Sequence, residues 1–310
     1  MQTVLRPLTI GELFDRAVTL FVRHFSIVSL VVLCFVVPVT VFDAVIGNDM
    51  SDVLRQIQAA SKAPPGQPPD PVMLQSMLQH SSLFTLLFVF ILIGAALVYA
   101  AVAVAVGRIY EDAKPEFRSI WKTTLRAFPT IVALSFLQVA VIIGWVLALV
   151  PAMIVMALVG ATAGALGPVG RVVAGVLIVV AMIAWFWGLL MLVIAMTFSY
   201  FAAAVERKGI SSAMSGAFAQ VFGGGNFRRV SLVALAFGAA EIASLLVAAV
   251  IEFTAASLVK SEIVNAVIEA GLSLLTYGFL ATLLAVLYYD ARARREGVDL
   301  QPSSSPLVAP

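Results

Sequence analysis

The fold class is decided by one uncharged stretch, IVALSFLQVAVIIGWVLALVPAMIVMALVGATA, at residues 131–163. A helix needs about 20 apolar residues to cross a bilayer, because roughly 30 Å of hydrocarbon is crossed at about 1.5 Å per residue. The stretch exceeds this length, and Arg171 is the only charged residue between Arg126 and Glu206. We therefore expect two long spans joined by a tight hairpin, which lies at the turn-forming residues Gly164, Gly167, Pro168 and Gly170.

The composition of the whole chain also indicates a membrane protein. Of 310 residues, 62% are hydrophobic and only 12% are charged, and the mean hydropathy is +1.05. A soluble domain has roughly a quarter of its residues charged, so lipid must cover much of this surface. The net charge of +2 is too small to indicate nucleic-acid binding, and the single Cys34 excludes a disulfide framework or a cysteine-based metal site.

Six segments are long and apolar enough to be transmembrane helices. Besides the two spans of the hairpin, these are residues 25–42, 83–107, 230–259 and 263–289. Pro151 lies inside the third span and is expected to kink it. The expected fold is an all-α polytopic integral membrane protein with six transmembrane helices.

The distribution of basic residues predicts the orientation of these spans. Fifteen of the 19 Lys and Arg residues fall before span one, between spans two and three, between spans four and five, or after span six. Because Lys and Arg concentrate in cytoplasmic loops, we expect a multi-pass protein of the cell inner (plasma) membrane with both termini in the cytoplasm. The remaining four are Arg55, Lys62, Arg171 and Lys260.

A short amphipathic segment precedes each odd-numbered span. Thr9 and Glu12 form a capping-box pattern at the start of the first segment. We expect these three segments to be helices that lie in the headgroup layer. The alternative is that they are the ends of the following spans, but helix-breaking residues such as Pro129 separate the segments from the spans. Side chains at offsets 0, 3, 4, 7, 8 and 11 form one apolar stripe in each segment, with Thr124 as the weak position: Ile10, Leu13, Phe14, Ala17, Val18 and Phe21; Phe117, Ile120, Trp121, Thr124, Leu125 and Phe128; Ile210, Ala213, Met214, Ala217, Phe218 and Val221.

These features predict a pseudo-threefold repeat of in-plane helix plus transmembrane hairpin. A single membrane domain, residues 1–297, would contain units at about residues 8–112, 113–208 and 209–297. Residues 47–82 form an outer loop whose Pro-rich middle lies between two candidate polar helices, residues 52–62 and 72–80. Residues 298–310 form a disordered tail.

Three sequence blocks resemble a known family. They are LRPLTIGELFDRA at residues 5–17, AVERKGI at residues 204–210 with FRRV at residues 227–230, and YYDARARREG at residues 288–297. These blocks are similar to the glycerophosphoryl diester phosphodiesterase membrane-domain family, and the resemblance covers nearly the whole chain. It implies a membrane unit that precedes a catalytic barrel in some members and stands alone in others. A barrel takes about 250 residues, for which this chain has no room, so we expect no such activity here.

One acidic residue lies deep in a predicted span. Glu241 is 12 residues after Arg229 and 11 residues before Glu252, or about 18 Å and 16 Å along a straight helix. Gln138 lies at the same nominal depth in the third span and is the predicted hydrogen-bond partner. An ionised carboxylate at this depth costs roughly 3 kcal/mol, so Glu241 is either a neutral structural group or part of a transport site.

The sequence offers no catalytic, metal-binding or cofactor-binding constellation. His24 and His80 are predicted to lie on opposite sides of the membrane, so they cannot share a site. We expect a non-enzymatic membrane scaffold whose partners are membrane lipids or another membrane protein, with no nucleic acid and no cofactor. The alternative is a small transporter or permease with a polar site near Glu241 and Gln138.

Overall fold

The computed structural model describes residues 8–41, 71–164, 167–223, 226–258 and 262–296. Within these ranges every regular element is a helix, which confirms the all-α fold class. The predicted tail, and the outer loop up to residue 70, lie outside the described residues. The helices are α1 (Ile10–Arg23), α3 (Pro71–Tyr110), α4 (Phe117–Arg126), α5 (Phe128–Gly164), α6 (Gly167–Val205), α7 (Ile210–Phe222), α8 (Asn226–Leu258) and α9 (Glu262–Glu296), with a further helix, Phe25–Val41, after α1.

Several of these helices are long and apolar enough to cross a membrane. Four segments pass the length and hydropathy test among the described residues: Leu87–Tyr110, Phe128–Ala163, Gly167–Val205 and Ala270–Arg295. A fifth is added if the pair Ile10–Arg23 and Phe25–Val41 is counted as one broken span. The span predicted at residues 230–259 falls in α8, and several side chains of α8 are outside the described residues. The six-span arrangement therefore stays a prediction.

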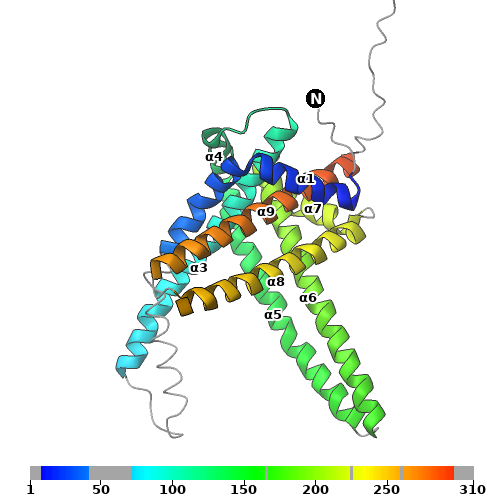
Figure 1. Cartoon of the computed structure of the whole chain (residues 1–310). Coiled ribbons are helices and arrows are strands. Elements are labelled where there is room, and N and C mark those ends of the chain that lie inside the picture. Colours follow the sequence, from blue (N-terminus) through cyan, green and yellow to red (C-terminus); the bar gives the residue numbers. More distant parts are fainter. Residues whose placement is uncertain (1–7, 42–70, 165–166, 224–225, 259–261, 297–310) are drawn as a thin grey trace, which may run out of the picture.

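Helices α5 and α6 form the predicted hairpin. They pack against each other and project away from the end of the molecule that holds α1, α4 and α7 (Figure 1). Large apolar side chains along both helices are more than half exposed, among them Leu147, Leu158, Val172 and Ile183. An uncovered apolar surface of this length is typical of a segment that contacts lipid.

The three predicted amphipathic segments are helices. In α1 the Thr9 hydroxyl accepts from the Glu12 N–H at 3.2 Å, and the Thr9 N–H donates to Glu12 Oε2 at 2.7 Å, so the capping box is confirmed. Each short helix precedes a longer one: α1 precedes Phe25–Val41, α4 precedes α5, and α7 precedes α8.

The apolar stripes of these short helices are divided between protein and surroundings. Leu13 and Ala17 of α1, Ile120 of α4, and Ala213 and Ala217 of α7 are buried. They pack where α1 contacts α9, α4 contacts α3, and α7 contacts α6. The flanks stay exposed, as at Val18, Leu125 and Ile210. Neighbouring helices therefore cover the centre of each stripe, whereas the sequence led us to expect the bilayer to cover it.

One connection differs from the sequence prediction, and another agrees with it. Residues 71–82 belong to α3, which runs without a break from Pro71 to Tyr110, so the predicted outer loop does not extend to residue 82 and the polar helix at residues 72–80 does not stand apart. The axes of α1 and the helix Phe25–Val41 meet at 81° around His24. A short amphipathic helix that is separate from the first apolar run is what the sequence predicted.

The buried centre is built from α3, α6 and α9. Small residues of α3 such as Ala100 and Ala101 are fully buried there, which permits close helix approach. Gly107 serves the same purpose, because a Cβ at that position would collide with the Tyr289 hydroxyl. That hydroxyl donates to the Ala103 carbonyl at 3.1 Å and so ties α9 to α3.

Candidate functional site

A buried carboxylate joins the two ends of the described chain. The Asp290 side chain, near the end of α9, is 0% exposed. Its Oδ1 accepts from the Leu8 N–H at 2.7 Å, and its Oδ2 accepts from Arg294 Nε at 3.2 Å. Arg229 Nε of α8 lies 2.9 Å from the same Oδ2, a charge contact whose N–H is not aligned for a hydrogen bond. Both arginines also donate to the Leu8 carbonyl, so this cluster fixes Leu8, α8 and α9 together.

A second acidic group lies just beyond α6. Lys208 Nζ is 2.5 Å from Glu206 Oε2, and Arg292 Nη1 is 3.7 Å from Oε1. The Tyr288 hydroxyl also donates to Glu206 Oε1. Burial disfavours the ionised form of Glu206, but the hydrogen bonds from Lys208 and Tyr288 and the nearby Arg292 charge outweigh it, so the pKa of this carboxyl lies below its usual value. Glu206 is therefore an anion at neutral pH.

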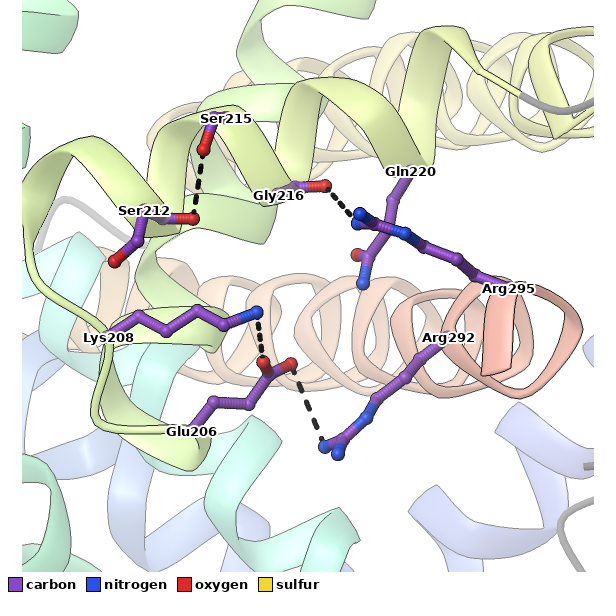
Figure 2. A pocket seen from close by; sticks show the side chains of 8 residues that line it. All are labelled: Glu206, Lys208, Ser212, Ser215, Gly216, Gln220, Arg292 and Arg295. Carbon is purple, nitrogen blue, oxygen red and sulfur yellow. Dashed lines mark hydrogen bonds and ion pairs between the residues drawn. The ribbon is translucent and has the colours of Figure 1, made fainter. Parts of the chain in front are cut away.

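Beside Glu206 a pocket of about 560 Å³ opens between α7 and α9. Figure 2 shows Arg295 directed from α9 toward Gly216 of α7, while Lys208 and Arg292 point toward Glu206. Arg295 Nη1 donates to the Gly216 carbonyl at 3.3 Å, which brings α9 against α7. The lining residues are Glu206, Lys208, Ser212, Ser215, Gly216, Gln220, Arg292 and Arg295, and we call this space the α7–α9 pocket.

One polar group in the α7–α9 pocket has no partner. Gln220 is 4% exposed, and its Oε1 makes no hydrogen bond within the described part of the chain. Leaving a buried amide oxygen unpaired costs about 1–3 kcal/mol. The pocket therefore combines an excess of positive charge, which suits an anionic group, with an unfilled acceptor, which needs a hydrogen-bond donor on the ligand or a turn of the amide.

A smaller basic pocket of about 150 Å³ adjoins the first and shares Lys208 with it. Arg126 at the end of α4 and Arg207 also line it. Arg207 has a φ of 54°, in the left-handed region that favours glycine. The turn after α6 thus holds a non-glycine residue in a costly conformation in the wall of the smaller pocket.

The structure places the two sequence-predicted polar residues as follows. Gln138 of α5 accepts a hydrogen bond from the Tyr200 hydroxyl of α6. Both line a cavity of about 220 Å³ together with Phe237 of α8. Glu241 lies one helical turn after Phe237 in α8, but its side chain is outside the described residues, so the pairing of Glu241 with Gln138 stays a prediction.

Several residues of the site were missed by sequence reasoning. Glu206, Lys208, Asp290 and Arg292 lie in the blocks that carry the family resemblance, yet Lys208 and Arg292 were used only to orient the spans. The sequence signal that could have identified them is that charged residues occur in each of the three blocks that resemble the family. Gln220 carried none, because it lies on the expected polar face of its segment.

Comparisons with family models, with curated proteins and with solved structures give no match for this chain. Its function is therefore inferred from the residues and their geometry.

Proposed function

We propose that this chain is a non-enzymatic, multi-pass protein of the cell inner membrane that organises anionic lipids, and through them other membrane proteins. In this proposal the chain crosses the membrane six times with both termini in the cytoplasm. Three units of in-plane helix plus hairpin make up the membrane domain.

The observation that carries the proposal is the separation of apolar and basic surface along α5 and α6. Exposed apolar side chains such as Leu158 and Val172 follow the hairpin toward its tip. Arg126, Arg207 and Lys208 gather around pockets at the opposite end. A basic rim next to lipid-covered helices attracts anionic headgroups by about 1 kcal/mol per Lys or Arg near the surface.

The experiment extracts the full chain in native-lipid particles and identifies the lipids around it. We expect anionic lipids to be enriched over the bulk membrane. Arg126→Gln, which removes a charge from the smaller basic pocket, should lower the enrichment about fivefold. Arg171→Gln, at the start of α6 beside the hairpin tip, is the matched control and should leave it unchanged. A lipid composition equal to the bulk would contradict the proposal.

A second candidate function, a small transporter, is favoured by the cavity that Gln138 and Tyr200 line. It would use the charge cycle of Glu241, four residues beyond Phe237 in the cavity wall. Glu241→Gln should then abolish function and leave thermal stability intact, whereas Glu241→Leu would also lose an interhelical bond of about 0.6 to 2 kcal/mol. Wild-type behaviour of Glu241→Gln in every assay that detects loss of this protein would remove the transporter candidate.

A further inference from the structure

We propose that the α7–α9 pocket binds a phosphate group, and that the headgroup of an anionic phospholipid supplies it. The phosphate site is inferred from the pocket itself, while the lipid as its source rests on the proposed function.

The charges of the pocket leave it positive. Lys208, Arg292 and Arg295 line it with Glu206 as the one acidic residue among the lining side chains. Glu206 is occupied by Lys208 at 2.5 Å and lies farther, at 3.7 Å, from Arg292. The lining side chains thus carry three positive charges and one negative charge, and the planar fork of the Arg295 guanidinium suits two phosphate oxygens at once.

Gln220 gives independent evidence for a ligand. Its side chain points from α7 into the space beside Arg295 (Figure 2), and its Oε1 is buried without a partner. The last torsion of a glutamine side chain is roughly two-fold, so the amide can turn its NH₂ toward the pocket. An anion there would accept from this NH₂.

The size and position of the pocket favour a headgroup as the source of the phosphate. Its volume of about 560 Å³ falls within the 300–1,000 Å³ typical of small-molecule sites, more than a lone ion requires. Glu206 directly follows the last residue of α6, and Arg292 and Arg295 lie in the last turns of α9. Basic side chains at the ends of spanning helices reach the headgroup layer.

The test measures two probes on the purified full chain in detergent. Calorimetry with inorganic phosphate reports on the site without a membrane, and native mass spectrometry compares retention of phosphatidylglycerol with that of phosphatidylcholine. We expect phosphate binding and preferential retention of phosphatidylglycerol. Arg295→Gln and Gln220→Leu should each weaken both about tenfold, as expected for loss of a hydrogen bond to a charged group. Arg171→Gln removes a charge from the far end of α6 and should change neither.

Gln220→Leu also separates binding from folding. It removes an unpaired buried oxygen, so the unliganded variant should be at least as thermally stable as the wild type while it binds more weakly. Unchanged binding of both probes by Arg295→Gln and Gln220→Leu would overturn the site, even if anionic lipid stayed enriched around the protein. Pocket-dependent binding of inorganic phosphate without preference for phosphatidylglycerol would support the phosphate site and overturn the lipid source, and with it the proposed function.

Discussion

Arg229 and Asp290 form an ion pair at 2.9 Å, although 61 positions of sequence separate them. The Asp290 carboxylate is completely buried, and the Leu8 N–H donates to it as well. The pair thus holds the start of α8, the end of α9 and the segment before α1 in one cluster. This cluster fixes the basic end of the molecule, where the pockets lie.

Removal of the Asp290 charge should destabilise the protein strongly. Asp290→Asn leaves Arg229 partly buried without its counter-ion, and breaking a buried pair in this way costs about 3–5 kcal/mol. Denaturant unfolding in mild detergent measures the loss. Asp15→Asn, at an exposed acid of α1, is the control and should stay within about 0.5 kcal/mol of the wild type. Equal effects of the two substitutions would show that the Asp290 cluster does not hold these elements together.

Glu206 should make stability depend on pH in the acid range. Its pKa in the folded protein lies below the ordinary value of 4.5, so its contribution is fully present above pH 4.5 and is lost as the pH falls through the folded pKa. The stability difference between wild type and Glu206→Gln should therefore be constant near neutral pH and shrink below about pH 4.5. Unfolding curves recorded from pH 7 to pH 3 measure it, and a difference that grows on acidification would contradict the ion-pair geometry.

The backbone at Arg207 gives a prediction with a matched pair of variants. Its φ of 54° costs an L-residue with a Cβ about 1–2 kcal/mol. Arg207→Gly and Arg207→Ala remove the same charge, but only glycine relieves the strain. Arg207→Gly should be the more stable of the two by about 1 kcal/mol in thermal unfolding, and equal stability would mean that the left-handed conformation carries no cost.

The contact between Gln138 and Tyr200 should couple α5 to α6. Gln138→Leu and Tyr200→Phe each remove one partner of the hydrogen bond. A double-mutant cycle should give a coupling energy of about 0.6 to 1.7 kcal/mol, the range found for polar pairs between membrane helices. Additive losses would mean that the two side chains do not interact, and would return Gln138 to Glu241 as a candidate partner.

The elements that could be predicted from the sequence are those set by local pattern. The uncharged run across residues 131–163 defines α5, and the turn residues near Gly167 end it and begin α6. The capping box of Thr9 and Glu12 likewise locates the start of α1. These features need only neighbouring residues, and length and hydropathy suffice to recognise them.

The site could not be predicted in the same way, because long-range packing creates it. Leu8 and Asp290 are 282 positions apart in sequence, yet the Leu8 N–H donates to the Asp290 carboxylate. No local sequence pattern predicts that hydrogen bond. Gln220 follows the polar spacing of its helix, yet α9 packs over it and buries it. The angle of 81° between α1 and the helix Phe25–Val41 is likewise not given by the hydropathy of either segment.

The most direct test of the membrane arrangement is two-sided labelling of the α5–α6 hairpin and α7. Single cysteines are placed at Arg171, near the hairpin tip, and at exposed Ser211 of α7, in a background with Cys34→Ser. A membrane-impermeant maleimide should label Arg171→Cys in intact cells, and should label Ser211→Cys only after the membrane is opened. Labelling of both positions from the same side would contradict a hairpin that crosses the bilayer and carries the α7–α9 pocket on the cytoplasmic face.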